Sequence, residues 1–154
     1  HFLILIVNIM QNALFIRQLT LFTDINIMAN NTIEAGEAAA AAIDTSSIEV
    51  LEGIRDKGRV WEDLCEQYGV KNPTPPWKMS LEGMCDALSE ASCALPPVER
   101  RWEEDELSEK LYLDVPFPER QLLALAHSMI RRNLVDEKEL ADRMKIVDKR
   151  LNMV

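Results

Sequence analysis

The sequence predicts an all-α fold: a small helical domain of two helical hairpins, preceded by an extended or helical N-terminal arm. Apolar residues recur at three- and four-residue spacing along most of the C-terminal half. No segment alternates apolar and polar residues over a full strand length. The chain has 154 residues, enough for one domain with a modest core.

Residues 1–27 differ from the rest in being rich in Ile, Leu, Phe and Asn. Asn8, Gln11 and Arg17 interrupt the apolar run, so no membrane span is expected. Three interpretations stay open: upstream sequence translated by mistake, an amphipathic arm, or a targeting segment. We treat 1–27 as a mistranslated or disordered N-terminal extension, because Met28 opens a segment of different composition.

Residues 28–79 are expected to form an N-terminal arm. The alanine run at 38–42 predicts a frayed helix or a disordered stretch. Residues 46–69 show helical periodicity, with Ser46 or Ser47 as the expected cap, a break near Gly58 and a left-handed stop at Gly69.

A proline-rich linker closes the arm at residues 70–79. Pro73, Pro75 and Pro76 forbid helix there and favour an extended path. The linker is therefore the predicted boundary between the arm and the body of the protein.

Residues 80–154 are expected to fold as the two hairpins, 80–111 and 117–152. In the first hairpin, Ser80 is the expected cap of a helix over 80–94, and a second helix follows over 98–111. Each hairpin is preceded by a proline and an aromatic residue, Pro76-Trp77 in the first and Pro116-Phe117 in the second. This shared entry suggests a weak internal repeat.

The second hairpin has clear start and stop signals. Pro118 suits a first helical turn, and Asn133 suits a left-handed turn between the helices. Asp136 and Glu139 have the spacing of a capping box, with Val135 and Leu140 placed as a hydrophobic staple.

Charge and composition exclude several function classes. The net charge is −9, which disfavours binding to nucleic acid or to an anionic membrane and favours partners with positive patches. We expect a soluble cytoplasmic protein. The three cysteines, Cys65, Cys85 and Cys93, form no CxxC pair and are expected to be small buried thiols.

Residues for catalysis or metal binding are scarce. His127 has no evident partner for general-base chemistry, so a surface or interface position is expected. The run at 103–106 is expected to be a solvated acidic face, because consecutive carboxylates on a helix point in different directions. We therefore predict no catalytic residue, metal ligand or cofactor site in this chain.

Arginines are the remaining candidates. Arg100, Arg101 and Arg120 either pair with nearby acids such as Glu103 and Glu119, or reach across an interface to an oxyanion.

Residues 112–144 resemble a known signature. The matching positions are Tyr112-Leu113, Pro116-Phe117, Glu119-Arg120, Leu122-Leu123-Ala124, Ala126, Asn133-Leu134-Val135 and Lys138-Glu139-Leu140. This pattern resembles the helical N-terminal domain of nitrile hydratase β subunits and of the related thiocyanate hydrolase β subunit. A fainter similarity extends upstream through Pro75-Pro76-Trp77, Leu81-Glu82 and Ala87-Leu88.

The resemblance implies a non-catalytic β-type subunit of a hydratase complex. Its partner would be an α-type subunit with a C-x-x-C-S-C motif that holds cobalt or iron, and a separate SH3-like barrel chain is a further expected partner. The complex would hydrate a nitrile or thiocyanate. Arg101 is the first expected contact to the partner's active site, and Arg120 the second.

A rival interpretation assigns the chain to another class. Accessory proteins of the same family share the helical unit, so the alternative is a metallochaperone-like interaction module without an enzymatic role. An unrelated helical domain that converged on the hairpin pattern is a third alternative.

Overall fold

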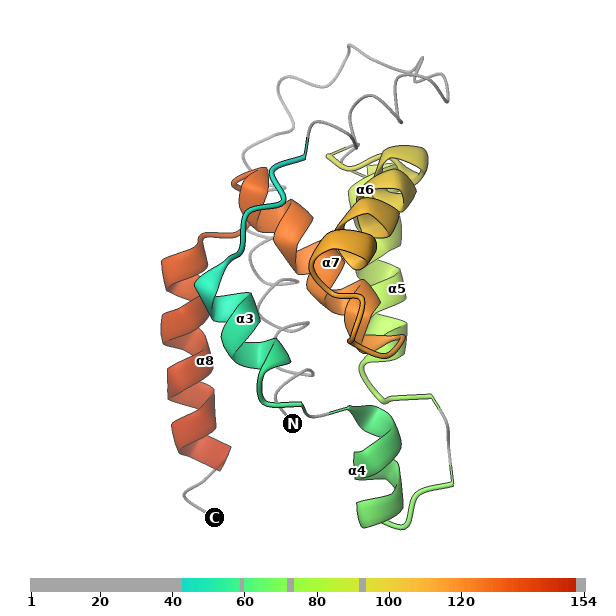
Figure 1. Cartoon of the computed structure of the whole chain (residues 1–154), viewed down its shortest axis with the longest axis vertical. Helices are drawn as coiled ribbons and strands as arrows, with labels where there is room; N and C mark the ends of the chain where they lie inside the picture. Colours follow the sequence, from blue (N-terminus) through green and yellow to red (C-terminus); the bar gives the residue numbers. More distant parts are fainter. Residues whose placement is uncertain (1–42, 59, 72–73, 92–93, 152–154) are drawn as a thin grey trace.

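The computed structural model describes residues 43–58, 60–71, 74–91 and 94–151 (Figure 1). The extension expected at 1–27, the alanine run at 38–42 and Cys93 lie outside the described residues. Within the described ranges all regular structure is helical, which confirms the all-α prediction. The elements are α3 (Glu49–Arg55), α4 (Trp61–Gln67), α5 (Lys78–Asp86), the π-helix η1 (Ala87–Ala91), α6 (Pro97–Lys110), α7 (Glu119–Arg131) and α8 (Glu137–Leu151).

The predicted helix over 46–69 is divided in two. Gly58 has a φ of 57°, and this left-handed residue separates α3 from α4. Gly69 has a φ of 65° and ends the α4 region, as expected. Both positions favour glycine, because a Cβ would strain the backbone there.

Two predicted serine caps are wrong. Ile48 occupies the N-cap of α3, and no side chain caps that helix. Ser46 instead accepts hydrogen bonds from Arg131 through its hydroxyl and carbonyl oxygens. Ser80 lies inside α5, which begins two residues earlier at Lys78 because the buried Trp77 takes the N-cap position.

The turn between α7 and α8 follows the sequence signals. Asn133 has a φ of 55°, and the carboxylate of Asp136 accepts the Glu139 backbone N–H at 2.8 Å. Val135 and Leu140 are both buried, as a hydrophobic staple requires. The side chain of Glu139 pairs with Arg143 instead of closing the capping box.

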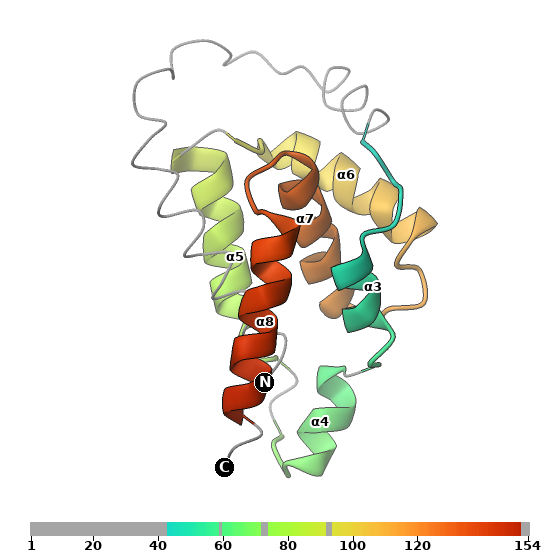
Figure 2. The same cartoon turned by 90° about the vertical axis from the view of Figure 1, so that its left-hand side faces the viewer.

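Helix α7 is the centre of the bundle. Residues 122–130 are all buried, so the helix is enclosed on every side and not only along its apolar stripe. Its most extensive packing is against α6, which runs in the opposite direction, while α3 contacts both α7 and α8 (Figures 1 and 2). The closest helix pair is therefore α6 with α7, which belong to different predicted hairpins, and the packing within each predicted hairpin is weaker than this.

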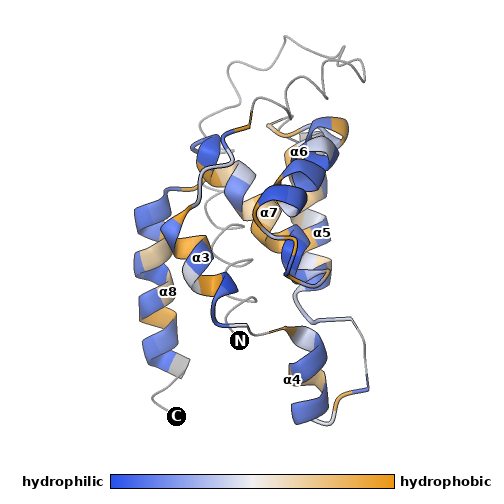
Figure 3. Ribbon diagram, in the orientation of Figure 1, coloured by the Kyte–Doolittle hydropathy of each residue, from blue (hydrophilic) through white to orange (hydrophobic). Residues whose placement is uncertain are grey.

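The hydropathy pattern agrees with this arrangement. In Figure 3, α7 shows many apolar residues, whereas α6 and α8 present mostly hydrophilic residues in this view. The core also contains buried leucines from every other described helix except α4, which buries none of its residues. α4 is therefore attached to the bundle by few contacts (Figure 1).

Candidate partner-binding face

Several exposed apolar side chains belong to segments at the end of the bundle where α4 lies (Figure 1). Among the described residues, the exposed large apolar side chains in this region come from the α4–α5 connection, the start of α5 and the α6–α7 connection: Tyr68, Val70, Met79, Leu113 and Phe117. We call these five residues and α4 the α4 end. Val98 and Ile146 are exposed elsewhere, on α6 and α8. A contiguous apolar surface formed by such residues would be typical of an interaction surface.

Two cavities lie beside Glu119 at the α4 end. One, of about 270 Å³, is lined by residues that include Ile54, Val115 and Leu123. The other, of about 320 Å³, lies between Trp61 and Phe117. Both share Glu119 in their walls, so they flank the point where α4 meets the bundle. Cavities of this size accept apolar side chains of a partner.

Glu119 holds α4 in place. Its carboxylate accepts the backbone N–H of Trp61 at 2.7 Å, at the first residue of α4. Burial raises the pKa of Glu119, since the site shields the carboxylate from water, and the Trp61 N–H opposes that shift. Glu119 therefore has a structural partner other than an arginine.

Arg120 lies at the same end, in the first turn of α7. Its side chain is half-buried, and its guanidinium has no hydrogen-bond or ion-pair partner among the described residues. Next to it, Lys78 donates to Gln121 and lies 5.1 Å from the centre of the Phe117 ring. Lys78 also pairs with Glu82 at 3.4 Å, and α4 itself carries carboxylates, so this end of the molecule has mixed charge.

Arg101 lies on a different helix from Arg120. It belongs to the first turns of α6, and α6 and α7 run in opposite directions (Figure 1). Arg101 is 68% exposed and pairs with Asp105 at 3.1 Å. Arg120 has no such partner in the described part of the chain, so the two candidates differ both in the helix that carries them and in what binds them.

The prediction of a surface position for His127 is wrong. The ring is fully buried on α7, and its Nδ1 lies 3.0 Å from the Tyr112 hydroxyl. Its Nε2 lies 2.8 Å from the carbonyl oxygen of Asp44. Because a carbonyl only accepts, Nε2 donates and Nδ1 accepts the Tyr112 O–H. Both ring nitrogens are thus used to fasten residue 44 and the α6–α7 connection to α7.

Arg131 completes this attachment. It pairs with the Asp44 carboxylate at 3.2 Å and donates to the Ser46 carbonyl at 2.6 Å. His127 and Arg131 are one helical turn apart and contact the same short segment. No local pattern in the sequence links positions separated by more than 80 residues, so these roles were missed.

The acidic run is only partly a solvated face. Glu103 is 2% exposed and pairs with Arg132, which also pairs with Glu99. Asp105 is exposed as expected. Glu103 faces inward because α6 turns this side toward the end of α7, and Arg132 compensates its charge.

Metal and thiol chemistry find little support in the described ranges. Those residues contain no group of three or more His, Cys, Asp or Glu side chains placed to hold a metal ion. Cys85 is a free buried thiol, and burial raises its pKa, which makes it a poor nucleophile. Cys65 is half-buried, so the expectation of buried thiols is met by Cys85 and not by Cys65.

Comparisons with known proteins add no assignment. No family model, curated protein or solved structure matches this chain. Separately, none of the helices in the described residues combines the length and apolar character needed to cross a membrane.

Proposed function

We propose that this chain is a non-catalytic β-type subunit that covers the metal-bearing α-type subunit of a nitrile hydratase or thiocyanate hydrolase-like complex. The resemblance over residues 112–144 supports the choice of partner. The observation that carries the proposal is the gathering of exposed apolar side chains at the α4 end.

The α4 end has the composition of an interface. Phe117 is 60% exposed in isolation, and a partner that covers it removes apolar surface from water. Aromatic side chains in such positions often supply much of the binding energy. Trp61 and Leu64 of α4 are only half-buried in this chain, so part of their apolar surface remains for a partner.

Arg120 is the residue that we propose serves the partner's site. An unpaired, half-buried guanidinium suits a planar contact to an oxyanion, such as the oxygens of oxidised cysteine ligands. In that role the residue positions ligands and leaves the chemistry to the cobalt or iron of the partner, which activates water. Arg101 would need the opposite end of the bundle to face the partner.

The experiment is co-expression with an α-type chain that has the C-x-x-C-S-C motif, in cobalt-supplemented medium. The proposal expects a stable complex on gel filtration that turns over a nitrile or thiocyanate, while this chain alone is inactive. Transient association with metal transfer and no stable complex would instead support the metallochaperone-like alternative.

Two arginine variants rank the site residues within that complex. Arg120→Ala is expected to lower turnover by about tenfold or more while the complex still assembles, since one charge-assisted contact is lost. Arg120→Lys should recover only part of the rate, because lysine lacks the planar fork. Arg101→Ala is the matched control, and a larger loss from it would transfer the role to Arg101.

A further inference from the structure

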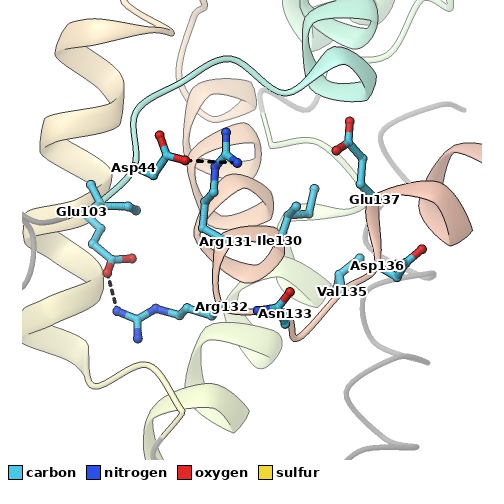
Figure 4. Close-up of a pocket in the computed structure, with 10 residues that line it drawn as sticks. Asp44, Glu103, Ile130, Arg131, Arg132, Asn133, Val135, Asp136 and Glu137 are labelled. Atoms are coloured by element: carbon cyan, nitrogen blue, oxygen red, sulfur yellow. Dashed lines mark hydrogen bonds and ion pairs between the residues drawn. The ribbon is translucent and has the colours of Figure 1, made fainter.

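Residues 43–47, which we call the strap, lie against α7 and are fastened to it by two of its side chains. Nε2 of His127 donates to the Asp44 carbonyl oxygen at 2.8 Å. Arg131 pairs with the Asp44 carboxylate at 3.2 Å, as Figure 4 shows, and donates to the Ser46 carbonyl oxygen at 2.6 Å. The strap thus depends mainly on polar contacts to the second half of α7.

Of these contacts, only the one from His127 comes from a fully buried side chain. The side chains of Asp44 and Arg131 are 56% and 27% exposed, so water competes for their interaction and the pair contributes little to stability. Ile48, which follows the strap, is buried in the core and anchors α3 without the help of the strap. The state of His127 therefore bears most on whether the strap stays attached.

The contacts of His127 require a neutral imidazole. Its Nδ1 accepts the Tyr112 O–H at 3.0 Å, which is possible only while this nitrogen has no proton. A proton on Nδ1 would force the hydroxyl to accept, and the buried O–H would lose its only acceptor among the described residues. Glu52 and Arg55 of α3 act on Tyr112 with opposite signs, so they do not offset this cost.

The charges that act on the ring also oppose its protonation on balance. Nε of Arg131 lies 3.4 Å from Nε2 of His127, so a protonated ring would place two cations side by side. The Asp44 carboxylate favours a charged ring, but it is exposed and already pairs with Arg131. No charged side chain of α6 or α8 within the described ranges acts on the ring. Burial is the largest cause that lowers the pKa of His127, so the neutral ring is the form that fits the closed strap.

We propose that protonation of His127 releases the strap while the helical core stays folded, which makes the attachment of the chain's N-terminal part sensitive to pH. The strap contacts the ring directly, so lifting the strap gives water access to the imidazolium. The open form then binds the proton more tightly than the closed form, and a falling pH shifts the population toward the open form. The attachment is complete above the ordinary pKa of histidine and is lost as the pH falls below it.

The test is site-directed spin labelling of the full chain at Ser47→Cys, with the three native cysteines replaced by alanine or serine. Ser47 is exposed, so the label reports the mobility of the strap without entering the core. We expect the mobile fraction in the electron paramagnetic resonance spectrum to rise about twofold or more as the pH falls from about 7.5 to about 5.5. A label at the exposed Asp148→Cys on α8, and the far-ultraviolet circular dichroism, should stay constant over the same range.

His127→Gln is the matched variant. Its side-chain amide can donate to the Asp44 carbonyl and accept the Tyr112 O–H, but it does not titrate. The mobility of the label at residue 47 should therefore become independent of pH in this variant. The same rise in His127→Gln, no rise with His127 present, or an equal rise at residue 148 would overturn the proposal.

A second variant decides the question if His127→Gln does not fold. Tyr112→Phe removes a hydrogen bond that only the neutral ring accepts, so the ring should protonate more readily. The rise in mobility should then occur at a higher pH than with Tyr112 present. A midpoint that is unchanged or lower in Tyr112→Phe would also overturn the proposal.

Discussion

At the scale of single residues, the hydrogen bonds of His127 are expected to contribute to the stability of the fold. It is buried in the central helix and hydrogen-bonded at both ring nitrogens, to Tyr112 and to the Asp44 carbonyl. We expect His127→Phe to lower the free energy of unfolding by about 1–3 kcal/mol, because buried partners lose their hydrogen bonds. Denaturant unfolding measures the change.

A double-mutant cycle with Tyr112→Phe separates the hydrogen bond from packing. If the Tyr112–His127 bond matters, the double variant should lose less stability than the sum of the two single losses. Strict additivity would show that the two side chains contribute independently, contrary to the geometry.

The same residue gives a pH prediction. Burial lowers the pKa of His127 below its ordinary value of 6.5, and the hydrogen bond to Asp44 opposes this only in part. The unfolded chain therefore binds more protons than the folded chain below about pH 6.5, and the free energy of unfolding falls as the pH falls. Buried Glu119 has a raised pKa, so its protonation stabilises the folded chain as the pH falls. The pH dependence of wild type alone therefore does not isolate the contribution of His127.

Comparison with His127→Phe isolates it. The stability difference between wild type and this variant should shrink as the pH is lowered from about 7.5 to about 5.5. Only wild type has the buried imidazole, and protonation of that imidazole favours the unfolded chain. A difference that stays constant over this range, measured by urea unfolding at each pH, would contradict the assigned burial.

Residue roles were predictable where they are local. Asn133 and Asp136 act within one turn of chain, so their sequence signals sufficed. His127 and Arg132 depend on residues 83 and 29 positions away, respectively, and no spacing rule reports such distances. The buried state of Glu103 was missed for the same reason.

At the scale of elements, the start of α8 depends on one cap. The carboxylate of Asp136 accepts the Glu139 N–H, so Asp136→Ala should cost about 0.5–2 kcal/mol in the free energy of unfolding. Asp142→Ala is the control, since it removes an exposed carboxylate from the same helix whose ion pair is with Lys145. Equal losses from both variants, measured by thermal unfolding, would argue against a capping role.

The attachment of α4 is a second prediction at this scale. Glu119→Ala removes the acceptor of the Trp61 N–H, and α4 has no buried residue to hold it otherwise. We expect trypsin to cleave after Lys71 several-fold faster in this variant, because local opening becomes easier. Glu119→Gln keeps an acceptor and removes the buried charge, so its cleavage rate should stay near that of wild type. Similar rates in both variants would mean that other contacts hold α4.

The element boundaries show what sequence signals resolve. Gly58, Gly69 and Asn133 fix backbone conformations directly, and each marks a break or turn where expected. The predicted serine caps are wrong for two reasons. Ser46 binds Arg131, and Ser80 lies inside α5, after the helix has started. The preference of serine for the N-cap therefore matters less here than the burial of Ile48 and Trp77.

At the scale of the whole molecule, the fold is a bundle organised around α7. The apolar stripe Leu122, Leu125, Ala126 and Met129 identified the helix, but the burial of its remaining faces depends on α6 and α3 packing around it. Pairing between helices is a tertiary property, which is why sequence periodicity predicted two hairpins and not the close α6–α7 pair. The α4 end also emerges only in three dimensions, from segments near residues 70 and 115.

Binding through the α4 end is the central claim, and a pair of aspartate substitutions tests it most directly. Phe117 and Val98 are both exposed apolar residues, but only Phe117 belongs to the α4 end. Co-purification with the C-x-x-C-S-C chain should be abolished by Phe117→Asp and preserved by Val98→Asp, because only the first places a charge in the proposed interface. Retention of the complex by Phe117→Asp, or its loss in Val98→Asp alone, would contradict the account.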